Sequence, residues 1–254
     1  MKNNIKMYEK GSIEILHADS SHSFPLHSHE CFCFGVVKGG RVHFKIGEQE
    51  KLLSKGMTYL IPSNVGVIIS AAERYSYTTI CLKNEIKDYL MQFHYTGYFP
   101  QTGADAQIGA LCANFINGGS PEIFLKEIFR YLQMEADEKR PADAENREIE
   151  LVEKGKKYIR DHVYEKFSLD DLAGYVHVSK YHFIRLFKKH TGVTPNQYYI
   201  QAKLYIAKKE LKRNEKETDV AVDLNFADQS YLCNLFKKQM GISMKDFRNN
   251  IKVI

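Results

Sequence analysis

The chain has 254 residues, which is long enough to bury a sizeable core and more typical of two modest domains than of one. Its composition, 44% hydrophobic and 26% charged, is that of an ordinary globular protein and excludes a disordered or collagen-like chain. The sequence contains no basic start followed by an apolar run and no stretch of about eighteen apolar residues, so we expect no secretion signal or membrane span and predict a cytoplasmic protein.

The basic charge lies in one half of the chain. Residues 151–254 contain 20 Lys and Arg against 12 Asp and Glu, whereas residues 1–150 contain 16 against 19. This asymmetry indicates a polyanionic partner for the C-terminal half, although a solvated basic surface would produce it too.

The cysteines favour buried reduced thiols over a disulfide framework, because they are odd in number and mostly scattered. Cys31 and Cys33 lie in a strand-like run, in which side chains alternate between the two faces. The full set is Cys31, Cys33, Cys81, Cys112 and Cys233.

Residues 12–82 are expected to form β-structure. Short apolar or alternating runs over 31–37, 42–46 and 57–61 are separated by glycine-containing turns. This close, regular spacing is typical of a sandwich or a small barrel.

From residue 84 onward the apolar residues recur with a helical period, which predicts helices over 84–95, 104–117 and 121–136. Almost no large apolar residue follows up to residue 146, and a proline interrupts that stretch. We therefore interpret 137–147 as an interdomain linker.

The C-terminal domain, residues 148–254, is predicted to be all helical and contains an internal repeat. The run LFKKHTGVT over 186–194 recurs 49 residues later as LFKKQMGIS over 235–243. Two copies are too few for a solenoid, so each is expected to be a small motif that packs against its twin.

The first copy predicts a helix-turn-helix over residues 168–192. Ser168 can cap a helix over 169–175, and Ser179 can cap a second helix over 180–190 that Gly192 ends. Two short helices joined by so tight a turn, the second with basic and aromatic residues, form a helix-turn-helix. The residues expected to face a DNA groove are Lys180, Tyr181, Ile184, Arg185, Lys188 and Lys189.

Arg185 is the best candidate for reading a base, because its guanidinium can bind O6 and N7 of guanine together. Lys188 and Lys189 are expected to contact phosphates. For any one of these residues alone, a solvated helix face would be the simpler interpretation.

The second copy, over residues 218–241, matches the first. Asp228 can cap a helix over 229–240, and the connecting helix over 196–213 would be roughly 27 Å long, near the ~34 Å between successive major grooves. One chain could therefore place both units in adjacent grooves of a direct, asymmetric site. The outward residues of the second copy are Gln229, Ser230, Cys233 and Asn234, with Lys237 and Lys238 as expected phosphate contacts.

The runs over 179–192 and 221–241, with the helix between them, resemble the DNA-binding domain of the AraC/XylS regulators. The resemblance covers about residues 150–250. It implies that bases are read from the positions of Tyr181, Ile184, Arg185, Gln229, Ser230, Cys233 and Asn234.

Three positions depart from the family pattern. Asn225 replaces a common glycine and still tolerates a left-handed backbone, and Met244 replaces the usual proline, although Pro195 is present in the first unit. Where the family often has arginine there is Asn234, which predicts weaker specificity at the second groove.

The resemblance also implies an α+β fold of two domains, in which a cupin-like β-barrel with trailing helices precedes the all-α tandem helix-turn-helix domain. The effector-sensing and dimerisation domain would span residues 1–136, with the barrel over 12–82 and helices over 84–136. The candidate effector-pocket residues are His27, His29, Phe34, His43 and Tyr59. Each could equally stabilise the barrel mouth or the core.

A metal-dependent cupin would add a glutamate and a third histidine to His27 and His29. The region after Pro62 contains no histidine, so we expect no metal, no cofactor and no catalytic residue. A cupin-type metal-dependent enzyme with a helical appendage remains the alternative, and a protein-interaction module is a third possibility.

These features predict a sequence-specific transcription regulator, most simply an activator, that responds to a small molecule and is not an enzyme. The expected partners are double-stranded DNA, a small-molecule effector, a second copy of the chain in a homodimer, and RNA polymerase. The residues leave open the effector, the operator, activation against repression, and the dimer interface.

Overall fold

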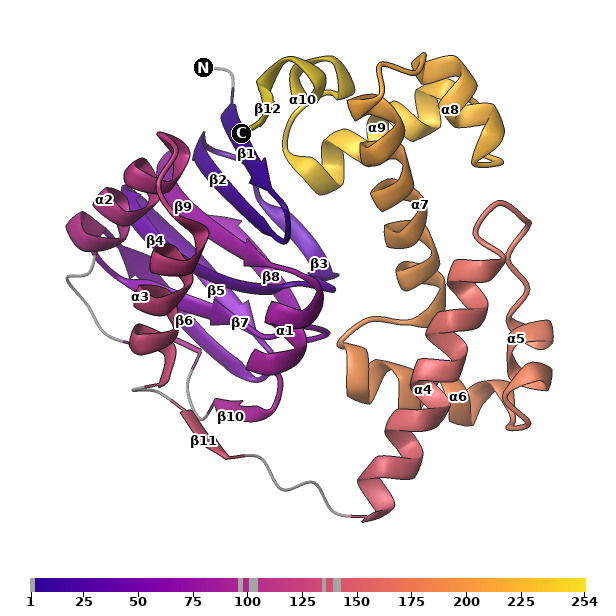
Figure 1. Ribbon diagram of the computed structural model, residues 1–254. Helices are drawn as coiled ribbons and strands as arrows, with labels where there is room; N and C mark the ends of the chain where they lie inside the picture. Colours follow the sequence, from indigo (N-terminus) through magenta and orange to yellow (C-terminus); the bar gives the residue numbers. More distant parts are fainter. Residues whose placement is uncertain (1–2, 96–97, 101–104, 134–135, 139–142) are drawn as a thin grey trace.

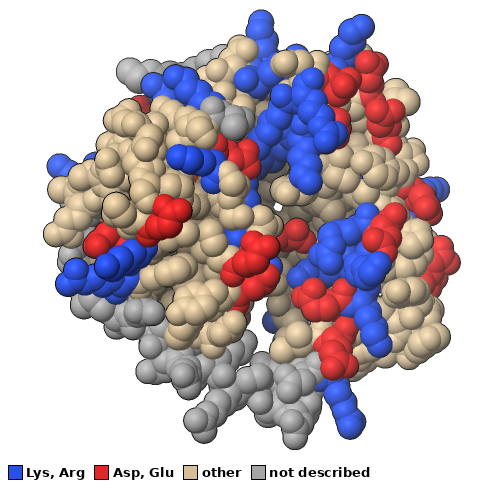
Figure 2. Space-filling model, viewed as in Figure 1, with Lys and Arg blue, Asp and Glu red and all other residues tan. Residues whose placement is uncertain are grey.

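The computed structural model describes residues 3–95, 98–100, 105–133, 136–138 and 143–254. A β-rich N-terminal half and a helical C-terminal half lie side by side with a hollow between them (Figures 1 and 2). Within these residues no helix is both long enough and apolar enough to cross a membrane.

Two sheets form the N-terminal half. The larger has the strand order β12-β1-β2-β9-β4-β7 and the smaller β3-β8-β5-β6, and all pairs are antiparallel except β1 with β12. The strands are β1 Asn4–Lys10, β2 Ile13–Ser20, β3 Phe24–Ser28, β4 Phe32–Gly39, β5 Arg41–Ile46, β6 Gln49–Ser54, β7 Thr58–Ile61, β8 Gly66–Ala71, β9 Tyr75–Leu82 and β12 Ile251–Val253.

The predicted α+β class, with a β-rich domain before a helical one, is confirmed. The barrel is open, however, because among the described strands no hydrogen-bonded pair joins one sheet to the other.

Helices cover the outer face of the larger sheet (Figure 1). These are α2 Asp105–Ile116 and α3 Pro121–Gln133, whereas α1 Asn84–Leu90 lies on the side toward the helical half (Figure 1). The predicted helix over 84–95 extends too far, because Phe93–Tyr95 forms strand β10 and pairs with β11, Ala136–Glu138. The helix expected over 121–136 likewise ends at Gln133.

Strand β4 is buried on both faces. Phe32 and Phe34 pack against the helices, while Cys33 and Val37 point between the sheets. A strand covered on both sides loses the apolar-polar alternation of a half-exposed strand, so its sequence does not indicate which side chains point inward.

The C-terminal half is helical, as expected, up to β12 at its end. Of the expected linker over 137–147, residues 137–138 belong to β11, residues 139–142 lie outside the described residues, and α4 begins at Asp143. The helices are α4 Asp143–Asp161, α5 Leu169–Tyr175, α6 Lys180–Thr191, α7 Pro195–Lys212, α8 Glu217–Asp223, α9 Gln229–Met240 and α10 Met244–Asn250.

Caps fix the bounds of the two helix-turn-helix units. Ser168, Ser179 and Asp228 each accept a hydrogen bond from the backbone N–H three residues on. Gly192 and Gly241 end α6 and α9 at φ 73°, a conformation that favours glycine. The predicted helices of both units consequently agree with the structure to within two residues.

Candidate functional site

Helix α6 has one buried and one exposed face. Phe183 and Phe187 lie in the core of the first helix-turn-helix unit, and Tyr181 on the opposite side is 77% exposed. Arg185 and Lys188 are exposed there too. Within the part of the chain that the structure describes, neither makes an ion pair. The outward face of α6 is therefore open to a ligand.

Two other cations of α6 pair with carboxylates of the same domain. Lys180 Nζ lies 2.9 Å from Asp170 Oδ1 on α5, and Lys189 Nζ lies 2.5 Å from Glu148 Oε2 on α4. Ile184 is half-buried. Arg185 and Lys188 are thus the cations of this face that are most available to DNA.

Helix α9 presents a polar face. Gln229, Ser230 and Asn234 are exposed, as are Lys237 and Lys238. The half-buried Cys233 points toward neighbouring helices, because its Sγ lies 3.6 Å from Glu217 Oε2 and 3.7 Å from Met244 Sδ. Gln229 also contacts Glu217, at 3.4 Å. Of these residues, Cys233 is the least suited to reach a base edge.

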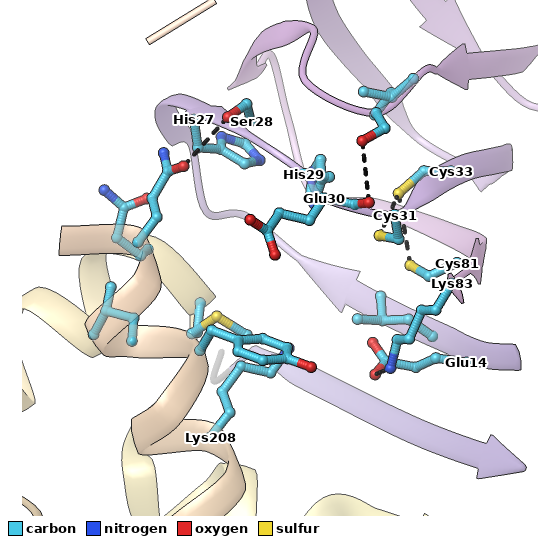
Figure 3. A pocket seen from close by; sticks show the side chains of 18 of the residues that line it. Glu14, His27, Ser28, His29, Glu30, Cys31, Cys33, Cys81, Lys83 and Lys208 are labelled. Carbon is cyan, nitrogen blue, oxygen red and sulfur yellow. Dashed lines mark hydrogen bonds and ion pairs between the residues drawn. The ribbon is translucent and has the colours of Figure 1, made fainter. Parts of the chain in front are cut away.

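A large cavity of about 1190 Å³ lies between the two halves of the chain. The inner faces of the strands form one wall and α7 forms the other, so residues from both domains face the same space (Figure 3). Apolar side chains supply much of the lining, among them Met7, Ile61 and Leu204. A cavity with mostly apolar walls and a few polar groups is typical of a small-molecule site.

Charged residues gather in one corner of the cavity. Lys83 Nζ lies 2.9 Å from both Glu9 Oε1 and Glu14 Oε2, and Lys212 of α7 pairs with Glu9. Burial by itself would raise the pKa of Glu9, but hydrogen bonds from Lys212 and Lys83 outweigh it and lower that pKa to about 2. Burial by itself would raise the pKa of Glu14 too, but Lys208, which lies near this corner as well, and Lys83 lower it.

Three thiols meet in the cavity wall beside this charged corner, where Cys81 pairs with Glu14 across β9 and β2 (Figure 3). The Sγ atoms of Cys31 and Cys33 are 3.5 Å apart, and those of Cys33 and Cys81 are 3.7 Å apart. Hydrogen bonds from the Cys33 and Cys81 thiols lower the pKa of Cys31, because they stabilise its thiolate. The side chain of His29 lies next to this group.

The structure separates the five predicted pocket residues. His27, His29 and Tyr59 line the cavity. Phe34 instead packs against Tyr131 in the helical layer, and His43 lies on the outer side of the smaller sheet with its Nδ1 3.1 Å from Glu50 Oε1. Phe34 and His43 therefore do not line this cavity.

His27 and Tyr59 each have a polar neighbour within hydrogen-bonding distance in the N-terminal half. His27 Nδ1 lies 2.7 Å from the Pro25 carbonyl, and burial lowers the pKa of His27 to about 3. The Tyr59 hydroxyl lies 2.6 Å from Thr79 Oγ1.

Sequence reasoning missed most of the cavity. Lys83 and the residues of α7 could not be assigned to it, because the site forms only where the two domains pack together. The spacing of His29, Cys31 and Cys33 was a usable signal, since alternate residues of an extended chain share a face.

The loop between β3 and β4 joins the two halves. The Glu30 carboxylate accepts a hydrogen bond from the Tyr198 hydroxyl of α7 and lies 3.4 Å from Arg160 Nη1 of α4. Ser28 Oγ donates to Gln201 Oε1 at 3.3 Å. This loop therefore contacts α4 and α7 of the helical half directly.

The comparison with protein families agrees with this two-part arrangement. Residues 10–150 match the model of the AraC-like ligand binding domain, which is more than half of the chain. The chain belongs to the AraC family. Residues 172–250 of this AraC-family chain match a helix-turn-helix domain model, so the predicted resemblance is confirmed in both halves.

Curated relatives are similar over different shares of their length. LumQ of Photobacterium leiognathi, a probable transcriptional regulator, is 25% identical over 89% of this chain and 91% of its own. The bifunctional transcriptional activator and DNA repair enzyme AdaA of Bacillus subtilis is 34% identical over 45% of this chain. The chain spans 54% of AdaA, about half of its length.

Among solved structures, an apo form of ToxT from Vibrio cholerae, a variant with one lysine replaced by alanine, is similar over 96% of this chain and 100% of its own, with a TM-score of 0.66. Its sequence identity is 12%, so the likeness shows a shared two-domain fold.

Proposed function

We propose that this AraC-family chain is a sequence-specific transcription regulator, which binds double-stranded DNA through α6 and α9 in adjacent major grooves. The observation that supports this most directly is the open face of α6, where Arg185 and Lys188 are exposed and unpaired within the described chain. The second unit repeats the same capped helix with Lys237 and Lys238 exposed.

The proposal is tested by fluorescence anisotropy of the full-length protein with labelled DNA from upstream of its own gene, at two salt concentrations. We expect specific binding against scrambled competitor, with log affinity falling by about 0.9 per phosphate contact for each unit of log salt concentration. Affinity that is equal on scrambled DNA, or that hardly changes with salt, would contradict the proposal.

We further propose that the interdomain cavity is the effector site. Its apolar walls and its cluster of lysines suit a small molecule with an apolar body and a negatively charged end. Wild-type ToxT has been crystallised with a bound unsaturated fatty acid, a ligand of this general chemistry.

Thermal-shift titration with aliphatic carboxylates and with alcohols of equal length tests this ligand class. We expect the carboxylates to stabilise the protein more than the alcohols, and Lys208→Met to reduce that difference. An equal response to both series would exclude a role for the charged end.

The proposed partners are RNA polymerase and a second copy of the chain, with which it forms a homodimer. The proposed action is activation of transcription in the cytoplasm. Effector binding would change how both helix-turn-helix units are presented, because the cavity walls belong to both domains. The enzyme alternative is not favoured, since LumQ, matched over most of the chain, is described as a probable transcriptional regulator.

A further inference from the structure

The thiols in the cavity wall form a compact cluster that the proposed DNA and effector binding leaves unused. Cys31, Cys33 and Cys81 come from the β3–β4 loop, β4 and β9, and β4 and β9 place Cys33 directly opposite Cys81. The other cysteines lie elsewhere: Cys112 on the buried side of α2 and Cys233 on α9. Two segments far apart in sequence therefore bring three of the five sulfurs together.

The spacing of these sulfurs matches a metal site. In a tetrahedral zinc site with Zn–S bonds near 2.3 Å, neighbouring sulfurs are about 3.8 Å apart. The observed separations are 3.5 Å between Cys31 and Cys33 and 3.7 Å between Cys33 and Cys81. Cys33 therefore contacts both of the other sulfurs at separations close to those of a zinc site.

An imidazole lies beside two of these thiols. The ligand atoms of His29, Cys31 and Cys33 all lie within 4.8 Å of one another. The backbone of this segment is fixed from the other side, because Asn64 N donates to the His29 carbonyl at 2.8 Å and Ser63 Oγ donates to the Glu30 carbonyl at 3.0 Å. Cys81 is not part of this group of three, but its Sγ lies 3.7 Å from that of Cys33, so the three thiols and this imidazole can supply a Cys3His set, which is a recurrent zinc combination.

We propose that His29, Cys31, Cys33 and Cys81 bind a thiophilic metal ion of the zinc class in the wall of the interdomain cavity. Three thiolates select soft or borderline cations over calcium and magnesium. All four residues line the cavity, so an ion can enter from the same space as an effector. The sequence-based expectation of no metal concerned a cupin histidine triad, and this ligand set is a different one.

Metal binding by the reduced full-length protein tests the site. We expect one Zn²⁺ per chain in competition with a chromophoric chelator, and Co²⁺ to give the thiolate charge-transfer absorption of a tetrahedral site. Cys31→Ser and Cys81→Ser should each lower the Zn²⁺ affinity by on the order of 100-fold or more, since even outer partners of a metal site are worth about 10–100-fold. Cys112→Ser and Cys233→Ser are the matched controls and should leave it unchanged.

A measurement on the unaltered chain avoids the risk that a variant misfolds. Alkylation by iodoacetamide, followed by mass spectrometry, should show Cys31 protected by Zn²⁺ and Cys233 equally reactive with and without it. Absence of stoichiometric Zn²⁺, equal affinity in the Cys31→Ser and Cys112→Ser proteins, or no protection of Cys31 would overturn the proposal.

Glu30 connects the proposed metal site to the DNA-binding domain. This step rests on the proposed function. Glu30 lies between two of the ligands, and its carboxylate contacts Arg160 of α4 and Tyr198 of α7 in the DNA-binding domain. A metal ion that fixes residues 29–33 would therefore fix this contact, and its binding would be coupled to that of DNA.

Anisotropy with full-length protein separates these possibilities. We expect Zn²⁺ to change the DNA affinity of the wild type, and Glu30→Gln to reduce that change while Zn²⁺ affinity stays the same. If Zn²⁺ binds but the DNA affinity does not change, the coupling is refuted and the metal site stands. If the wild type shows no specific DNA binding with or without Zn²⁺, the proposed function is refuted, and the metal titration still decides the site.

Discussion

Arg185 and Lys188 differ from the other cations of α6 in their surroundings. Lys180 and Lys189 pair with carboxylates of α5 and α4, and each such pair must break or adapt before a phosphate is bound. Arg185 is free of ion pairs within the described residues and lies one helical turn before Lys189. Base reading and phosphate binding at these positions should therefore be separable by substitution.

We predict that Arg185→Ala costs about 1–3 kcal/mol of binding free energy on the cognate site and relaxes discrimination at one base position. The reason is the loss of a bidentate contact to guanine. Anisotropy with a panel of single-base-pair variants of the operator measures it. An equal loss on every sequence would instead identify Arg185 as a phosphate contact.

Lys188→Ala is the matched substitution and should behave differently. Because a phosphate contact carries no sequence information, affinity should fall about equally on all sequences, and the salt slope should decrease by about 1. A change in base preference would contradict the assignment of Lys188 to a phosphate.

The positions of single residues also show what could not be predicted from the sequence. In β4, Cys33 points to the cavity and Phe34 points to the helices. Because both faces of this strand are buried, its sequence does not show which side chains point to which face. Cys81 joins Cys31 and Cys33 through strand pairing across about fifty residues. No local pattern could have predicted that third thiol.

The helical elements of the DNA-binding domain are bounded by local signals, which is why their sequence predicted them well. Thr194 accepts a hydrogen bond from Gln197 N, and the Gln197 side chain accepts one from the Thr194 N–H, completing a capping box at the start of α7. Phe93–Tyr95, by contrast, forms β10 only because it pairs with β11, a segment about forty residues away. Non-local pairing overrides local helical preference there.

We predict that Thr194→Ala lowers the free energy of unfolding by about 1 kcal/mol, because the first turn of α7 loses its side-chain cap. Urea unfolding of the full-length protein measures it. Thr218→Ala is the control: Thr218 is exposed within α8 and caps no helix, so its loss should change stability by less than about 0.5 kcal/mol. Equal effects of the two substitutions would rule out the capping role.

At the scale of the whole molecule, the two domains share one core. The buried cluster between the sheets continues into Leu204 and Ala207 of α7 and Phe236 of the second helix-turn-helix unit. Gly66 and Gly192 meet across the boundary so closely that a Cβ on Gly192 would lie 2.2 Å from Gly66 N. The C-terminal strand β12 adds to the N-terminal sheet. The sequence predicted two domains, but it could not predict this packing.

Glu9 connects these parts of the molecule, since it accepts hydrogen bonds from Lys83 of the N-terminal domain and from Lys212 of α7. Its pKa is about 2 in the folded protein against 4.5 as the ordinary value. A carboxyl group with a depressed pKa stabilises the folded state fully above its unfolded pKa, and this stabilisation is lost as the pH falls toward the folded pKa.

We therefore predict that wild type is more stable than Glu9→Gln at pH 7, by on the order of 1–2 kcal/mol once solvent screening of the partly exposed carboxylate is allowed for. The difference should persist down to about pH 5, shrink between about 4.5 and 2, and vanish below that range, because protonated Glu9 and glutamine are both neutral. Urea unfolding of both proteins across this range measures it. Glu50→Gln is the control on an exposed pair with His43 and should show little difference at any of these pH values. If the Glu9→Gln difference were independent of pH, packing and not charge would be what Glu9 contributes to the domain contact.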